Sequence, residues 1–216
     1  MNITVPPYKY ISQEKENLKF HFHPDHWADL MKSHLQLTTI WDANVFSCPP
    51  TRIAQILGSN PVNIRSAIAF PYYGIDFSRL KIFPCLQNSD GHKIKYLQRK
   101  GSTNHLYFCP NFFERLTDPR ERIFICEGEK KALRADQEGL CAIGISGIFG
   151  WARKGRKDLI EEFDLVLWNQ REVRLIPDGD WISNSNVKRG TLQLGHELRR
   201  RGAKVKVIDV RGLYGK

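Results

Sequence analysis

The second half of the chain alternates short apolar stretches with longer amphipathic ones, and this pattern restricts the fold more than any other feature. Strands are expected at residues 122–126, 141–145, 173–176 and 204–210, and helices at residues 129–138, 157–163 and 187–201. Strands that alternate with helices of this kind are typical of βαβ units. The pattern therefore predicts a mainly parallel sheet with helices on both faces.

The first half of the chain has a different pattern of expected helices and strands. A helical pattern follows His23-Pro24-Asp25, and a second short helix is expected at residues 50–57, where Gly58 ends it. Strand candidates separated by turn-forming residues follow at 67–73, 79–84, 93–98 and 105–109. A polar turn at residues 116–120 precedes the alternating half. We therefore expect a small α+β module over residues 1–118, with helices followed by antiparallel strands, and an α/β domain over residues 119–216.

Composition favours a polyanionic partner. The 216 residues include 33 Lys and Arg against 23 Asp and Glu, a formal charge of +10. Such an excess is common in nucleic-acid-binding proteins, although many basic proteins bind no nucleic acid.

The apolar runs are far shorter than the ~20 residues of a membrane span, and the N-terminus lacks the layout of a signal peptide. The five cysteines form no CxxC pair, which favours reduced thiols over zinc or disulfides. We expect a soluble, cytoplasmic protein.

Acidic residues follow two of the expected strands. Glu127-Gly128-Glu129 ends the first strand, and Asp178-Gly179-Asp180 comes just after the third. The carboxyl ends of parallel strands meet at one edge of a sheet, where α/β proteins bind their ligands. On extended backbone, Asp178 and Asp180 would point the same way. Carboxylates without nearby His or Cys suit Mg²⁺ or Mn²⁺. The alternative is that these acids cap helices or form turns.

At these residues the sequence resembles a known family. The order strand, Glu127-Gly128, helix, then strand and glycine-rich turn, then strand and Asp178-x-Asp180 resembles the Toprim domain. That domain is the metal-dependent catalytic module of bacterial-type primases, topoisomerases and certain nucleases. More closely, ICEGEKKALRADQEGLCAIGISGIFGW and IPDGDW resemble the primase-type Toprim-like domain of plasmid, phage and integrated-element replication proteins. Upstream segments KYLQRKGSTNHLYF and HPDHWADLMKSHL are similar to segments that precede that domain.

The resemblance implies roles for the acidic residues. Glu127 would be a metal ligand or general acid/base, Asp178 and Asp180 the metal-binding pair, and Glu129 a further ligand. The implied cofactor is Mg²⁺ or Mn²⁺, and the implied partners are DNA, as a single-stranded template, nucleotides and a helicase. Lys131 departs from the pattern, because those enzymes have an acid there. A late acidic motif is also missing, so we expect the chain to be a fragment of a longer protein.

Basic and aromatic residues supply candidates for nucleic-acid contact. The basic candidates near the expected carboxylate edge are Lys130, Lys131, Arg153, Lys154, Arg156 and Lys157. The alternative for them is an ordinary solvated surface. Tyr96 and Tyr107 lie near Lys93, Lys95, Arg99 and Lys100 in the sequence and are candidates for stacking bases. His21, His23 and His26 match no common zinc spacing, so we expect surface histidines there.

The sequence thus predicts an α/β, Toprim-like (Rossmann-like) domain with about four mainly parallel strands, preceded by a small α+β module. The function that the resemblance implies is primase-type nucleotidyl transfer, in which a 3′-hydroxyl displaces pyrophosphate from a nucleoside triphosphate. Two alternatives stay open. One is a metal-dependent nuclease that uses the same carboxylates. The other is a non-catalytic DNA-binding module that recruits a helicase, which Lys131 and the missing acidic motif favour.

Overall fold

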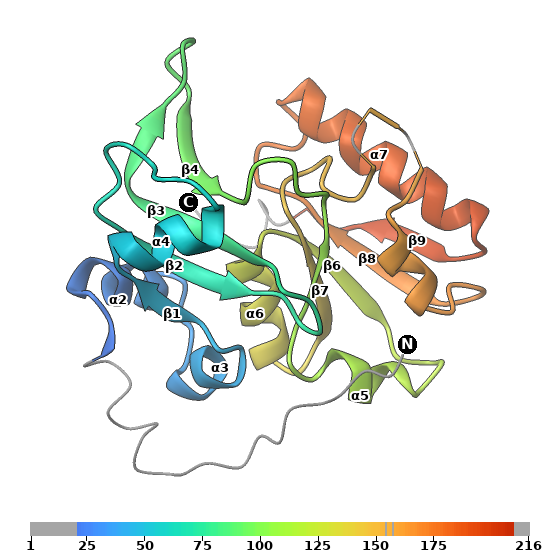
Figure 1. The fold of residues 1–216 in the computed structure, drawn as a ribbon. Helices are drawn as coiled ribbons and strands as arrows, with labels where there is room; N and C mark the ends of the chain where they lie inside the picture. The colour runs from blue at the N-terminus through green and yellow to red at the C-terminus, as the bar shows by residue number, and fades with distance from the viewer. Residues whose placement is uncertain (1–20, 154, 157, 210–216) are drawn as a thin grey trace, which may run out of the picture. The chain divides into compact units, whose positions relative to one another are not determined.

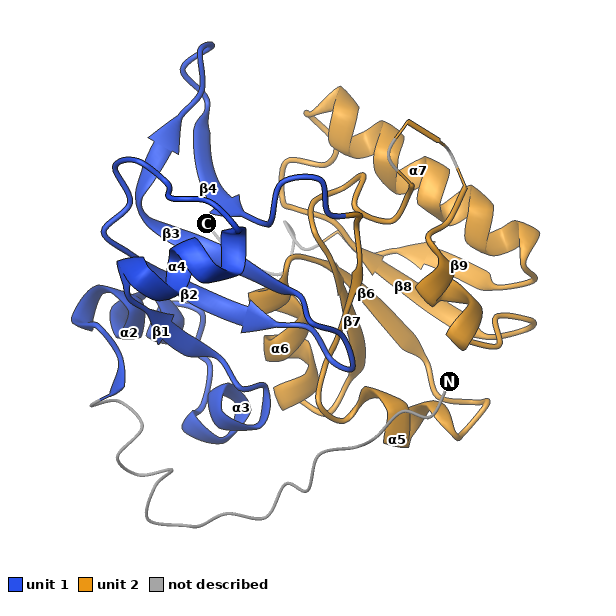
Figure 2. Ribbon diagram, in the orientation of Figure 1, with its two compact units in different colours: residues 1–102 blue, residues 103–216 orange. Residues whose placement is uncertain are grey.

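The chain divides into two units, residues 1–102 and residues 103–216, which Figure 2 shows in separate colours. The structure is a computed structural model, and it describes residues 21–153, 155–156 and 158–209. In this part of the chain no helix has the length and apolar character needed to cross a membrane. The two units are described separately below.

The first unit contains a four-stranded antiparallel sheet in the order β1-β2-β3-β4 (Figure 1). Its elements are α2 (Pro24–Met31), α3 (Leu37–Asp42), β1 (Phe46–Cys48), α4 (Pro50–Leu57), β2 (Ser66–Pro71), β3 (Ser78–Gln87) and β4 (Lys93–Leu97). The bounds of α4 match the prediction, because a proline opens the helix and Gly58 ends it with a φ of 68°. The sequence pattern missed α3 and β1, which are too short to establish a period.

His26 is the one buried histidine of the described residues, which corrects the expectation of a surface histidine there. It shares the inner face of α2 with Leu30, one turn further along the helix. Its Nδ1 lies 2.7 Å from the Ser47 hydroxyl and its Nε2 lies 2.9 Å from the Ser66 hydroxyl. The pKa of His26 is lowered to about 4, mainly by burial and in addition by the charge of the neighbouring His23.

This burial predicts a pH-dependent stability for the first unit. Because the folded-state pKa is about 4 and the usual value is 6.5, the unfolded state takes up the proton first as the pH falls. The contribution of His26 should therefore be complete above about pH 7 and decline between pH 6.5 and 4, by at most about 3 kcal/mol. Urea unfolding at several pH values measures the decline, and NMR titration of the ring measures the pKa.

His26→Gln should flatten this part of the pH dependence, whereas His92→Gln, at an exposed position, should leave it unchanged. A measured pKa of about 6.5 for His26 would contradict the prediction.

The second unit contains a five-stranded sheet in the order β5-β7-β6-β8-β9. Its strands are β5 (Leu106–Phe108), β6 (Ile123–Glu127), β7 (Cys141–Ile145), β8 (Glu172–Ile176) and β9 (Lys204–Val207). Its helices are α5 (Phe112–Leu116), α6 (Glu129–Gln137), the 3₁₀ helix η2 (Glu161–Leu165) and α7 (Ser185–Arg200). The last four strands are parallel, and β5 pairs antiparallel with β7. The predicted α/β fold with about four mainly parallel strands, preceded by a small antiparallel module, is confirmed.

Two expectations need correction. The strand expected at 105–109 was assigned to the first module, but as β5 it pairs with β7, so residues 103–118 belong to the second unit and the division falls after Ser102. The turn-forming residues on both sides of this strand give no indication of which sheet it joins. The helix expected at 157–163 is replaced by the short η2.

Helices α6 and α7 cover opposite faces of the parallel sheet, as predicted (Figure 1). The crossover β6-α6-β7 and the crossover β8-α7-β9 step in opposite directions from the centre of the sheet. Because such crossovers are right-handed, the two helices lie on opposite faces. Gly144 faces Ala132 of α6, whereas Leu175 lies close to Gly195 of α7.

Gly144 allows α6 to approach the sheet closely. A Cβ added at Gly144 would lie 3.1 Å from the Cβ of Tyr107 and 3.3 Å from the Cβ of Ala132. Gly144→Ala should therefore reduce the free energy of unfolding by about 1–3 kcal/mol, measured by urea unfolding. Gly179→Ala is the matched control, since an added Cβ there meets nothing within 4 Å. Equal destabilisation by both substitutions would contradict this account.

Candidate active site at the carboxyl edge of the parallel sheet

The parallel register brings the ends of three strands to one edge. Glu127, the last residue of β6, lies opposite Ile145, the last residue of β7. On the other side, Cys126 lies opposite Ile176, the last residue of β8. Gly128, with a φ of 102°, turns the chain from β6 into α6 and donates its N–H to the Ile145 carbonyl at 2.9 Å. The acidic residues that follow β6 and β8 therefore start from neighbouring positions.

Glu127 and Asp178 meet at this edge, although 51 residues separate them. The backbone N–H of Asp178 donates to Oε2 of Glu127 at 3.2 Å. Burial raises the pKa of Glu127, and the nearby charges of Asp178 and Asp180 raise it as well, while the hydrogen bond from Asp178 and the charge of Lys131 act in the opposite direction. The edge thus concentrates negative charge that a cation would stabilise.

Lys131 supplies positive charge within this group. It lies in the first turn of α6, and its ammonium forms an ion pair with Oδ1 of Asp178. Both side chains are about half exposed, at 48% and 47%. The sequence offered Lys131 as a nucleic-acid-binding residue, and the structure places its ammonium on the carboxylate of Asp178.

Asp180 occupies a turn, which corrects the expectation that it would point with Asp178 from an extended backbone. The Trp181 N–H donates to the carbonyl of Asp178 at 3.0 Å, so the chain turns between the two aspartates. The carboxylate of Asp180 accepts a hydrogen bond of 2.9 Å from the amide of Asn184. Asn184 is the N-cap of α7. Asp180 therefore supports the start of α7 and acts on Glu127 only through its charge.

Glu129 lies on the buried side of α6. Its side chain is buried, with 1% exposed, on the first turn of α6. Burial raises the pKa of Tyr107 on β5, and the charge of Glu129 is among those that raise it further. The charges that act on Glu127 come instead from Asp178, Lys131 and Asp180. Among the described residues, Glu129 does not form a group of three metal-holding acids with Glu127 and Asp178.

The donor set suits a hard divalent cation in kind, since Glu127 and Asp178 offer carboxylate oxygens and no thiol or imidazole. The arrangement is less complete than the sequence predicted. Among the described residues, no three His, Cys, Asp or Glu side chains are placed to hold a metal ion together. Glu127 and Asp178 are the residues that would hold Mg²⁺ or Mn²⁺, and Lys131 competes with such an ion for Asp178.

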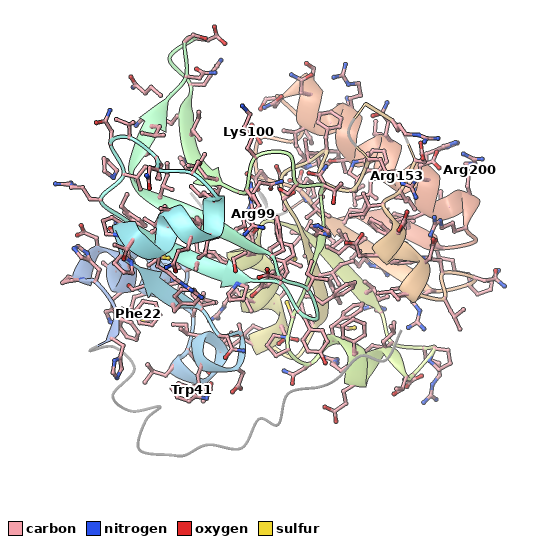
Figure 3. All side chains as sticks on the ribbon, viewed as in Figure 1. Phe22, Trp41, Arg99, Lys100, Arg153 and Arg200 are labelled. Atoms are coloured by element: carbon pink, nitrogen blue, oxygen red, sulfur yellow. The ribbon has the colours of Figure 1, made fainter. Side chains whose placement is uncertain are left out.

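The other basic candidates are largely matched by acids. Arg153, labelled in Figure 3, pairs with Glu161 at 2.9 Å. Arg156 pairs with Asp158 at 3.3 Å. Lys154 and Lys157 lie outside the described residues. Lys130 is partly exposed at the start of α6, beside the carboxylate edge.

The structure also changes which aromatic residues are candidates for stacking on bases. Tyr107 is buried, with 1% exposed, so it offers no ring for stacking. Tyr96 lies on β4 of the first unit, where the guanidinium of Arg79 is 4.7 Å from its ring centroid. The sequence reasoning missed Phe149, which is 40% exposed in the turn after β7. A bulky aromatic residue between two glycines of that turn was the available signal.

A known family model matches most of the second unit. Residues 112–216 match the family model described as "Domain of unknown function (DUF3854)". An uncharacterized protein of Picosynechococcus sp. is 35% identical over 105 residues, which cover 43% of this chain and 10% of that protein. The match thus covers about a tenth of the length of this relative.

Solved structures of primases share the fold. A DnaG primase catalytic domain bound to single-stranded DNA is 15% identical, with a TM-score of 0.56, over 91% of this chain and 69% of that chain. The Aquifex aeolicus primase, comprising zinc-binding and RNA polymerase domains, is 10% identical, with a TM-score of 0.59, over 95% and 57%. The E. coli primase catalytic core is 15% identical, with a TM-score of 0.53, over 89% and 67%. The predicted Toprim-like fold is therefore confirmed.

The ion pair of Lys131 with Asp178 predicts how this edge responds to metal ions. Lys131→Gln removes the competing ammonium, so the affinity for Mn²⁺ should rise by about fivefold, which corresponds to about 1 kcal/mol. Isothermal titration calorimetry or electron paramagnetic resonance of Mn²⁺ measures this affinity. Lys130→Gln removes the same charge one residue earlier and should change the affinity less. The account fails if the wild type and both variants bind Mn²⁺ equally.

Proposed function

We propose that this chain is a primase-type, nucleic-acid-acting Toprim domain that performs nucleotidyl transfer with Mg²⁺ or Mn²⁺. The observation that carries the proposal is the meeting of Glu127 and Asp178 at the carboxyl edge of a sheet whose fold is shared with primase catalytic cores. Ligand sites of α/β folds lie at this edge. The sequence resemblance given above supports a replication protein of a plasmid, phage or integrated element as the source of such a domain.

The two carboxylates have distinct tasks in this proposal. Asp178 and Glu127 would hold the cation, which when bound stabilises charge on the transferring phosphoryl group. Glu127 would also accept the proton of an attacking 3′-hydroxyl. In the protein without a cation, burial and the charge of Asp178 raise the pKa of Glu127. Asp180 acts through its charge and through the turn that it stabilises.

The proposed partners are single-stranded DNA as template and nucleoside triphosphates as substrates. The net charge of +10 favours a polyanionic ligand. A primase catalytic domain of the same fold has been solved with single-stranded DNA bound, which supports the same ligand class here. A helicase partner stays part of the proposal on the sequence resemblance alone.

The proposal predicts metal-dependent primer synthesis. The 216-residue chain, incubated with single-stranded DNA, labelled nucleotides and Mg²⁺ or Mn²⁺, should form products in which nucleotides are joined. Glu127→Gln should lower the rate by about 100-fold or more, because it removes both a ligand and the proton acceptor. Asp178→Asn should act similarly through the loss of a ligand.

Glu138→Gln is the matched control for this assay, since Glu138 follows the opposite end of α6 and pairs there with Arg134. It should retain the activity of the wild type. Shortened template instead of extended product would show a nuclease, and equal rates for Asp178→Asn and the wild type would contradict the proposed site.

A non-catalytic DNA-binding module is the second candidate, and one observation favours it. The ammonium of Lys131 already neutralises Asp178, so the edge is charge-compensated by the chain itself. A module of this kind would bind single-stranded DNA, form no product with any nucleotide, and bind equally well with Asp178→Asn. These outcomes separate it from the first proposal.

A further inference from the structure

An exposed aromatic ring lies at the carboxyl edge of β7 and has no part in the function proposed above. Phe149 is 40% exposed, whereas Trp151, two residues later, is 1% exposed. The turn between β7 and Trp151 therefore buries one large ring and presents the other. An exposed aromatic face at this edge is available to stack on a planar ligand.

The backbone holds this ring in one place. Gly147 has a φ of 87°, and the N–H of Gly150 donates to its carbonyl at 2.8 Å, which closes a tight turn. A Cβ added at Gly150 would lie 2.6 Å from the Ser146 hydroxyl oxygen, so the turn has no room for a larger residue. Phe149 is therefore presented by an ordered turn, and ordering it for a ligand costs little further entropy.

Helix α7 packs against the turn that carries Phe149. A Cβ added at Gly190 would lie 2.8 Å from Cγ1 of Ile148 and 3.1 Å from Cε1 of Phe149. The ring thus packs against a bare stretch of helix backbone. The preceding residue, Arg189, has its guanidinium carbon 5.6 Å from the centroid of the Phe149 ring. This separation is within the range of a cation–π contact.

The ring and the carboxylates belong to the same edge of the sheet. Glu127 and Ile148 line one hollow together with Thr191 and Leu194 of α7. Ile148 is the direct neighbour of Phe149, and Thr191 follows Gly190 on the helix. The ring of Phe149 comes from the turn after β7, Arg189 comes from α7, and Glu127 comes from the end of β6. These elements end or begin at this edge.

We propose that Phe149 and Arg189 form a platform for a nucleobase and its phosphate beside the Glu127–Asp178 pair. Phe149 stacks on the base, and Arg189 contacts the attached phosphate, as arginine does in many nucleic-acid sites. The base belongs either to single-stranded DNA or to a nucleoside triphosphate. The inference rests on the proposed function for the choice of a nucleic-acid ligand, and it assigns a binding role to residues outside the carboxylate pair.

The test measures binding to an oligonucleotide and to its abasic counterpart, which keeps the phosphates and lacks the bases. Fluorescence anisotropy of a labelled single-stranded DNA is recorded in EDTA, so that no divalent cation takes part in binding. Phe149→Ala should weaken binding of the intact oligonucleotide by about tenfold and leave the abasic one unchanged. Phe149→Trp, which keeps an aromatic face, should retain binding.

Leu192→Ala is the matched control, because Leu192 is 50% exposed on α7 and belongs to no contact described here. Arg189→Met should weaken binding of both oligonucleotides, since it removes a phosphate contact. If Phe149→Ala weakens binding of a nucleoside triphosphate and leaves single-stranded DNA unchanged, the platform holds the base of the nucleotide. If Phe149→Ala behaves as Leu192→Ala with both ligands, the proposal is overturned.

Failure here is distinct from failure of the proposed function. The anisotropy assay contains no divalent cation and measures no product, so Asp178→Asn does not decide it. Loss of nucleotidyl transfer in Asp178→Asn, combined with unchanged binding by Phe149→Ala, would leave the proposed function standing without the platform. The reverse combination would leave a base-binding edge without catalysis.

Discussion

The parallel pairing of β6 with β7 on one side and β8 on the other is the constraint on which the rest of the second unit depends. Ile125 lies opposite Ile143 in β7 and opposite Leu175 in β8, at the centre of the sheet. This register aligns the carboxyl ends of the three strands. Each parallel pair needs a crossover, and the crossovers place α6 and α7 on opposite faces. Residues far apart in the chain thereby share one edge.

The chemistry of the edge follows from its charge balance. Glu127 and Asp178 are brought together by hydrogen bonding and by the register, and burial makes the negative charge of Glu127 costly. Lys131 offsets this cost through its ion pair with Asp178. We expect the same Lys131 to limit the affinity of the edge for a divalent cation, because its ammonium is already paired with Asp178.

Regular periodicity predicted most of the fold. The bounds of β7 and of α4 match the prediction, because apolar runs and glycine or proline punctuation mark both ends. The meeting of Glu127 and Asp178 was also predictable, since it requires only that β6 and β8 be parallel neighbours. Local patterns could not show that β5 joins the second sheet, because pairing depends on a partner 35 residues away or more, such as Ile143 for Phe108.

The finer parts of the site depend on contacts that no sequence pattern encodes. The carboxylate of Asp180 accepts a hydrogen bond from Asn184, the N-cap of α7, and a DxD spacing does not reveal this contact. The contact of Lys131 with Asp178 joins a helix to a loop 47 residues later. The exposure of Phe149 and its contact with Arg189 depend on how the turn after β7 packs against α7, which no local pattern shows.

The central claim is that a divalent cation binds at the carboxyl edge of the parallel sheet, beside Glu127 and Asp178. Paramagnetic broadening by substoichiometric Mn²⁺ in an NMR titration tests it most directly. Backbone amide signals of Gly128, Ile145 and Asp178 should broaden first, while those of Ile123, Cys141 and Glu172, at the amino ends of the same strands, should broaden much later. Equal broadening at both edges, or none at either, would contradict the account.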